Sequence, residues 1–218
     1  MMKDGQGYTY VMIKPFSKND AENAMAQFII MKELEKRFAE KDLEIMYKQR
    51  VFYGKKDIEK HYQEHVGKSF YEDLENCLLK NNAVGMMVAD KNRSLDVIKT
   101  VRSMAGSTIK LDKQTGEIRL PEPNSIRYNM FFALYQIMHG TKFEDVVIPE
   151  NLEGCVKEYN QATNAVDIFK DGKQICTMYM TENLVHTSSS PEEAENEIKV
   201  FLNLKTNKEK EEGCEQSL

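Results

Sequence analysis

The chemically most suggestive part of the chain is His186, which comes just before an acidic stretch with helical spacing. Leu184 and Val185 precede it and have the apolar, partly branched character of a strand, so we expect His186 at a strand end. The side chains of residues 187–190 carry hydroxyls that suit a helix cap, and Pro191 suits the first helical position. The unpaired N–H groups of such a helix N-terminus favour anions, including phosphate.

Glu197 lies further along the same expected helix, where it can fold back in space toward the imidazole of His186. A carboxylate that accepts one ring N–H fixes the tautomer and leaves the lone pair of the other nitrogen to attack. The pair therefore has the pattern of an oriented nucleophile. The alternative interpretation is a partly buried structural histidine near a strand end, because most histidines are structural.

Four other segments carry side chains of types that bind phosphate, in a consistent order along the chain. They are Tyr8 to Pro15 with Lys14, His61-Tyr62 with the following Lys68-Ser-Phe70, Val97 to Thr108 with Arg102 and Gly106, and Asn124 to Arg127. Together with the histidine segment, these motifs resemble nucleoside diphosphate kinases over about Tyr8 to Leu202. The resemblance implies an α+β fold, an α/β sandwich in which a ferredoxin-like four-stranded antiparallel sheet is covered by helices.

The resemblance also implies a transferase that moves the γ-phosphoryl group of a nucleoside triphosphate, usually ATP, to a nucleoside diphosphate. The expected mechanism is ping-pong through a phosphohistidine at His186. The catalytic residues would be His186, Glu197 and Lys14. The nucleotide-binding residues would be Lys14, Tyr62, Phe70, Arg102, Thr108, Arg127, Asn183 and Ser188.

The chemistry of each of these side chains suits the role that the resemblance implies for it. Lysine and arginine supply positive charge around the phosphoryl oxygens, hydroxyls add donors, and Phe70 can stack on any base. Mg²⁺ is expected to bridge the terminal phosphates and to keep most of its waters, so no metal-binding residue of the protein is predicted.

The composition is compatible with a cytoplasmic enzyme. The chain has 35 acidic and 30 basic residues, so its charge balance does not indicate binding to nucleic acid or to an acidic membrane. No apolar run reaches the length of a membrane span or resembles a signal peptide, and the four scattered cysteines argue against a zinc site and against a disulfide framework. By resemblance, a homo-oligomer is expected, built from dimers, with a tetramer or hexamer as larger forms.

Apolar spacing predicts the elements that position these residues. Strands are expected at 9–13, 43–53 and 83–89, and helices at about 20–39 with Asp20 as cap, 57–65, 70–78 and 94–102. A hairpin is expected where residues 166–169 and 174–178 flank Lys170-Asp-Gly172. The strand that carries His186 and the helix that follows it complete the order of expected elements.

The chain departs from the family pattern at several places. Residues 128–180 are expected to be an inserted, ordered subdomain within a kinase-like domain spanning 1–203, followed by a disordered charged tail at 204–218. Residues 17–26 lengthen the turn after Lys14. Phe16, Thr187 and Ser189 replace an acidic residue, a glycine and an aspartate that are usual in the family.

Other functional classes fit the residues less well. The chain lacks a glycine-rich loop ending in Gly-Lys-Ser/Thr, which excludes a P-loop enzyme. His61 and His65 are spaced as zinc ligands on a helix but lack the glutamate of a metalloprotease motif. His139 is a second candidate nucleophile, but it lacks the capped helix that follows His186. The main alternative is a catalytically inactive nucleotide-binding or protein-interaction module on the same fold.

Overall fold

Four antiparallel strands form the sheet that carries the histidine segment, in the order β2-β3-β1-β9. The computed structural model describes residues 7–92 and 96–204. The chain divides into two compact units: the first runs to Arg102 and resumes at Val185, and the second is Ser103–Leu184. The antiparallel four-stranded sheet with its helices confirms the α+β, ferredoxin-like fold.

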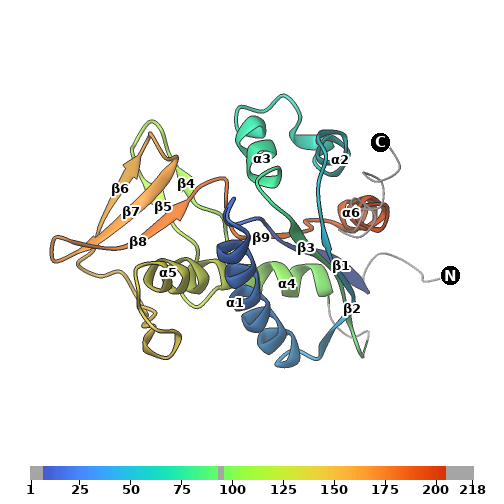
Figure 1. Ribbon diagram of the computed structural model, residues 1–218, viewed down its shortest axis with the longest axis horizontal. Helices are drawn as coiled ribbons and strands as arrows, with labels where there is room; N and C mark the ends of the chain where they lie inside the picture. Colours follow the sequence, from blue (N-terminus) through green and yellow to red (C-terminus); the bar gives the residue numbers. More distant parts are fainter. Residues whose placement is uncertain (1–6, 93–95, 205–218) are drawn as a thin grey trace. The chain divides into compact units, whose positions relative to one another are not determined.

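The first unit holds the sheet and most of the helices (Figure 1). Its strands are β1 (Tyr8–Ile13), β2 (Leu43–Val51), β3 (Ala83–Asp90) and β9 (Val185–Thr187). Its helices are α1 (Asp20–Ala39), α2 (Lys55–His61), η1 (Gln63–His65), α3 (Tyr71–Leu78) and α6 (Pro191–Leu202), and α4 (Val97–Ala105) crosses into the second unit.

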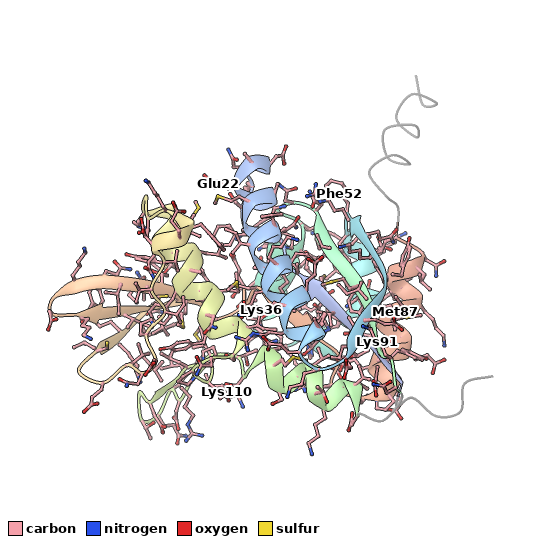
Figure 2. All side chains as sticks on the ribbon, turned by 90° about the horizontal axis from the view of Figure 1, so that it is seen from below. Glu22, Lys36, Phe52, Met87, Lys91 and Lys110 are labelled. Carbon is pink, nitrogen blue, oxygen red and sulfur yellow. The ribbon has the colours of Figure 1, made fainter. Side chains whose placement is uncertain are left out.

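Burial separates the central strands from the edge. β1 and β3 are almost wholly buried, whereas β2, which pairs only with β3, exposes Glu44, Met46, Tyr47, Lys48 and Arg50. Successive side chains of a strand point to opposite faces of the sheet. Tyr10 and Met12 of β1 therefore share one face, where they pack with Ile198 and Phe201 of α6. The long helix α1 also packs against β1 and β2; Figure 2 shows it running from Glu22 to Lys36.

Helix ends differ from the sequence expectation in two places. The cap of α1 is Asn19, whose Oδ1 accepts from the N–H of Glu22 at 3.0 Å, so Asp20 is the first helical residue rather than the cap. The helix expected at 57–65 begins at Lys55, because Asp57 caps the N–H of Gly54, and it ends at His61 before the separate turn η1. The start of the helix expected at 94–102 falls partly on residues outside the described ranges.

The second unit contains a small sheet packed on one helix. The strands β6 (Val156–Asn160), β7 (Ala165–Lys170) and β8 (Lys173–Tyr179) form a three-stranded antiparallel sheet, and α5 (Ile126–Met138) packs against β8. The short pair β4 (Lys110–Leu111) and β5 (Ile118–Arg119) and the turn η2 (Phe143–Asp145) complete the unit. The predicted hairpin is confirmed: Asp171 and Gly172 both have positive φ, at 51° and 73°, as a tight two-residue turn requires.

Residues 128–180, expected as an insertion, all lie within this second unit, and position 128 falls inside α5. The expected tail, apart from Leu204, lies outside the described residues. Among the described residues, no helix combines the length and the apolar character that crossing a bilayer demands.

Candidate active site

His186 occupies the middle of β9, and the strand register decides which way its ring points. It lies directly opposite Met12 of β1. Cross-strand partners project to the same face, so His186 shares the face of Tyr10 and Met12, the one covered by α6. The ring centroids of Tyr10 and His186 are 6.2 Å apart. The strand end expected at His186 is therefore one residue further on, at Thr187.

The helix α6 begins as the sequence predicted, with Pro191 in its first turn and Ser190 as its cap. Ser190 Oγ accepts from the N–H of Glu193 at 3.1 Å. The buried positions of α6 are Ala194, Glu197, Ile198 and Phe201, the spacing of one helical face. Glu197 is thus a carboxylate set within an apolar stripe, and the stripe packs against the sheet.

Glu197 and His186 are in direct contact. Oε1 of Glu197 lies 2.5 Å from Nε2 of His186, which leaves the lone pair of the neutral ring on Nδ1. The Glu197 side chain is fully buried, and that of His186 is 13% exposed. The ring is therefore held from the protein side and reaches the surface in part.

Ser188 holds the other oxygen of the same carboxylate. Its Oγ donates to Oε2 of Glu197 at 2.6 Å. Ser188 follows His186 by two residues and so projects to the same face of the strand. Burial raises the pKa of Glu197 to about 8, although the nearby His61 and the Ser188 hydrogen bond act to lower the pKa. The proton affinity of the carboxyl is thereby brought close to that of an imidazole.

Two of the expected nucleotide-binding aromatic residues differ in exposure. The Tyr62 ring is buried, and its centroid lies 5.3 Å from the centroid of the His186 ring. The Tyr62 hydroxyl has no hydrogen-bond partner among the described residues. Phe70 precedes α3 and is 39% exposed, so its ring is not a core residue. An exposed ring and an unsatisfied buried hydroxyl near the histidine both suit contact with a ligand.

Two of the expected cations also belong to the first unit. Lys14 directly follows β1, is buried, and is close enough to influence the pKa of His61. Arg102 on α4 extends its Nη1 to the carbonyl oxygens of Thr187 and Ser188, each at 3.5 Å. The guanidinium is therefore placed at the end of the strand that carries His186.

The other expected site residues, Thr108, Arg127 and Asn183, belong to the second unit. There, Arg127 near the start of α5 donates through Nη1 to the carbonyl of Gly106, two residues before Thr108. Asn183 has a buried Oδ1 that makes no hydrogen bond to a described residue. The structure thus links Arg127 to the loop that carries Thr108.

Sequence reasoning gave no catalytic role to two buried residues beside this cluster. His61 is fully buried, with Nε2 3.5 Å from Oε1 of Glu197, and its Nδ1 lies 3.2 Å from the hydroxyl of Tyr53. The sequence indicates His61 only as part of the His61-Tyr62 segment and as a possible zinc ligand, and Tyr53 only as part of a strand. The signal that was available is the adjacency of His61 to Tyr62 in the motif.

The spacing of this cluster argues for a shared proton rather than a metal ion. Donor atoms of His61, His186 and Glu197 all lie within 4.8 Å of one another. Two ligands of one tetrahedral zinc with bonds of about 2 Å would be roughly 3.3 Å apart. The 2.5 Å between His186 and Glu197 is shorter than that and fits a hydrogen bond.

The chain is similar in sequence to nucleoside diphosphate kinases. The family model described as nucleoside diphosphate kinase matches residues 7–145. The nucleoside diphosphate kinase of Thermococcus kodakarensis is 32% identical over 152 residues, which cover 70% of this chain and 78% of that protein. That of Methanocaldococcus jannaschii is 33% identical over 111 residues, covering 51% and 71% respectively.

A solved structure supports the fold over a longer stretch. The apo crystal structure of nucleoside diphosphate kinase from Encephalitozoon cuniculi aligns with a TM-score of 0.50 and 16% identity, covering 89% of this chain and 88% of that chain. The family model stops at residue 145, before the histidine segment, whereas the pairing of β9 with β1 brings that segment into the same sheet. On the extent of the family match and the identity to these relatives, the chain belongs to the nucleoside diphosphate kinase family.

Proposed function

We propose that the chain is a nucleoside diphosphate kinase that works by ping-pong transfer through His186. The observation that carries the proposal is the 2.5 Å contact between Nε2 of His186 and Oε1 of the buried Glu197. This contact fixes the ring so that Nδ1 carries the attacking lone pair. A structural histidine would not need a buried carboxylate that is itself held by a serine hydroxyl.

In the first half-reaction, Nδ1 of His186 attacks the γ-phosphorus of a nucleoside triphosphate. The Nδ1–P bond forms, the bond from the γ-phosphorus to its bridging oxygen breaks, and a nucleoside diphosphate leaves. The ring gains positive charge, which Glu197 balances by drawing the Nε2 proton toward Oε1. In the second half, an oxygen of another diphosphate attacks the phosphorus, the Nδ1–P bond breaks, and the proton returns fully to Nε2.

Positive charge around the phosphates would come from Lys14, Arg102 and Arg127. Their charges match the dispersed negative charge of a phosphoryl group in transfer. Hydroxyl and amide groups of Tyr62, Thr108, Asn183 and Ser188 would add contacts or hold the site. The orphaned polar atoms of Tyr62 and Asn183 support this role, because buried polar groups normally find partners.

The exposed ring of Phe70 would stack on the nucleobase. Every base offers a π-face, so such a contact tolerates different bases and suits an enzyme that accepts several nucleotides. ATP would then be the usual phosphoryl donor because of its supply rather than because of a specific base contact.

Mg²⁺ would accompany the nucleotide. The site consists of cationic, imidazole and hydroxyl groups, and its buried carboxylate is already held by His186 and Ser188, so a hard cation would be held by phosphate oxygens and water. When bound, the ion supplies neutralisation of charge on the terminal phosphates.

We also propose that the protein is a homo-oligomer built from dimers. β2 is an edge strand of the sheet, and its Met46 and Tyr47 are 53% and 42% exposed. Edge strands with exposed apolar side chains are prone to pair with another chain. Light scattering of the wild type and of Met46→Lys tests this: the variant should shift to the smaller species, and a monomeric wild type would reject the proposal.

The cytoplasm, where nucleoside triphosphates are made and consumed, is the compartment we propose. A fluorescent fusion that localised to another compartment would contradict this assignment.

Labelling with γ-³²P-ATP tests the central proposal. The wild type should acquire an acid-labile, alkali-stable label that is discharged by adding a nucleoside diphosphate, and His186→Ala should acquire none. His139→Ala is the matched control, because His139 is exposed and its ring, among the described residues, contacts only Tyr135, by a hydrogen bond to the carbonyl and by stacking on the side chain. A wild type that binds nucleotide without becoming labelled would instead be an inactive binding module.

A further inference from the structure

A second histidine faces the same carboxylate oxygen as His186. Nε2 of His61 lies 3.5 Å from Oε1 of Glu197, on the oxygen that Nε2 of His186 approaches to 2.5 Å. His61 belongs to α2, which packs against α6. Its ring is enclosed by Tyr10, Tyr53 and Tyr62, with centroids 4.7 to 5.4 Å away. The mechanism proposed above does not use His61.

The neighbours of His61 determine its tautomer. Nδ1 lies 3.2 Å from the hydroxyl of Tyr53, and that hydroxyl lies 3.1 Å from the hydroxyl of Tyr10. If Tyr53 donates to Nδ1, the ring proton is on Nε2 and points toward Glu197. The opposite arrangement would direct a lone pair at a carboxylate inside the protein, which is unfavourable. Burial lowers the pKa of His61 to about 3, so the ring is neutral.

We propose that His61 is a positioning residue for phosphoryl transfer. Its Nε2 lies 3.5 Å from Oε1 of Glu197, and an N–H directed at that oxygen favours the ionised carboxylate, the form that can hold the Nε2 proton of His186. The inference rests on the proposed function, since the role of Glu197 is to balance the charge that develops on His186 during attack. A protonated Glu197 could not balance that charge, so His61 would set the lower pH limit of the reaction.

The groups around Glu197 have opposing effects on its ionisation. Burial raises the pKa of Glu197 most, His61 and then Ser188 act to lower the pKa, and Glu193 and Glu64 raise it slightly. Among the described residues, the ionisable groups that act on this network are Tyr10, Lys14, Tyr53, Asp57, His61, Tyr62, Glu64, Cys77, His186 and Glu193. His61 is the one whose ring nitrogen is aimed at Oε1 without a hydrogen bond of its own to a described residue.

Two substitutions separate a positioning role from a packing role. His61→Phe keeps an aromatic ring in the aromatic enclosure but removes both nitrogens, whereas His61→Gln packs less well but offers an amide N–H that can reach toward Glu197. If His61 only fills space, His61→Phe should be the better replacement. If the N–H of His61 favours the ionised form of Glu197, His61→Gln should be the better replacement.

The pKa of Glu197 can be measured by ¹³C NMR of glutamate carboxyl groups, with the signal assigned by its loss in Glu197→Gln. We expect His61→Phe to raise this pKa by about one unit, the usual size of such an effect, and His61→Gln to leave it closer to wild type. The acid limb of the pH profile of kcat/KM should move by the same amount in His61→Phe. His139→Gln serves as the control and should change neither quantity.

The proposal is overturned if His61→Phe has a wild-type Glu197 pKa, or if it retains wild-type kinetics better than His61→Gln at every pH. Should His61→Phe fail to fold, Tyr53→Phe tests the same point by removing the hydroxyl that fixes the tautomer; it should raise the Glu197 pKa by a smaller amount, and no rise overturns the proposal. Because the NMR titration uses the unphosphorylated protein, a shifted pKa without any phosphoryl transfer would reject the proposed function and leave the His61–Glu197 coupling intact.

Discussion

The hydroxyl of Ser188 donates to Oε2 of Glu197 at 2.6 Å, the carboxylate oxygen that His186 does not contact. Each oxygen of this buried group therefore has its own donor, His186 from β9 and Ser188 from the residue that directly follows it. The two donors are two residues apart, and the N–H of Ser188 continues the pairing with β1 by donating to the carbonyl of Tyr10, so strand alternation places both side chains toward α6. This arrangement makes the orientation of the imidazole depend on groups that never touch the substrate phosphorus.

Ser188→Ala removes the donor to Oε2 and leaves that oxygen buried without it. The loss of a hydrogen bond to a charged group costs about 1.5 to 3 kcal/mol, so we expect kcat to fall roughly 10- to 100-fold. The loss should be larger near pH 6 than near pH 8.5, because the pKa of Glu197 would rise further. Steady-state kinetics at several pH values measure this.

Ser189→Ala is the matched control for that experiment. Ser189 is exposed, and the hydrogen bond it makes to Glu193 uses its backbone N–H, which the substitution retains. Equal losses in both serine variants would show that Ser188 acts only through the local backbone.

The stability of the fold should depend on pH through Glu197 in a defined window. Its pKa is raised by burial from 4.5 to about 8 in the folded state, so between these values the folded protein holds a proton that the unfolded chain has lost. Raising the pH therefore favours unfolding. From about pH 6.5 to 8, the free energy of unfolding should fall by about 1 to 2 kcal/mol, as measured by urea titration.

His61 has the opposite dependence. Its pKa is lowered by burial from 6.5 to about 3, so between these values the unfolded chain binds a proton that the folded protein does not. Lowering the pH favours unfolding there, and the two effects oppose each other between 4.5 and 6.5. In Glu197→Gln the alkaline decline should disappear and the acid decline should remain; an unchanged alkaline decline would assign it to another group.

Gly106→Ala should disturb the loop that joins Arg127 to Thr108. Gly106 has φ of +81°, and an added Cβ would lie 2.4 Å from the side chain of Ser125, which caps α5. We expect a loss of roughly 2 to 4 kcal/mol in stability from the combined strain and overlap, together with a higher KM for nucleotide. Urea unfolding and steady-state kinetics give the two quantities.

Gly154→Ala provides the comparison for that loss. It has a similar φ of +74° but nothing within 4 Å of an added Cβ, so it reports backbone strain alone. A stability loss as large in Gly154→Ala would mean that the contact with Ser125 contributes nothing.

Phe70→Ala should weaken nucleotide binding without changing the chemistry at His186. Stacking of a base on an aromatic ring is worth about 1 to 3 kcal/mol, so KM should rise roughly 5- to 100-fold, by similar factors for purine and pyrimidine nucleotides. Phe143→Ala, which removes a ring that is 65% exposed in η2, should have no effect. A loss confined to one base would contradict simple stacking.

Local sequence patterns predicted much of the fold. The apolar run of β1, the helical spacing of α1 and the Lys170-Asp-Gly172 turn of the β7–β8 hairpin depend on residues close in sequence, and the structure confirms all three. The predicted helix ends were less accurate, because neighbouring polar residues compete as caps: Asn19 rather than Asp20 caps α1. The separate turn after His61 also went unpredicted, since the apolar spacing continues across it.

The sequence by itself determined that the chain has a capped acidic helix after a histidine strand, and that Glu197 follows on that helix. Only the tertiary structure decided that β9 pairs with β1 in the register that directs His186 toward α6, and that His61 and Tyr53, from α2 and the segment after β2, meet the same carboxylate. The physical reason is separation along the chain: hydrogen-bonding capacity is a property of residue type, whereas its partner is fixed by strand register and helix packing between segments more than 100 residues apart.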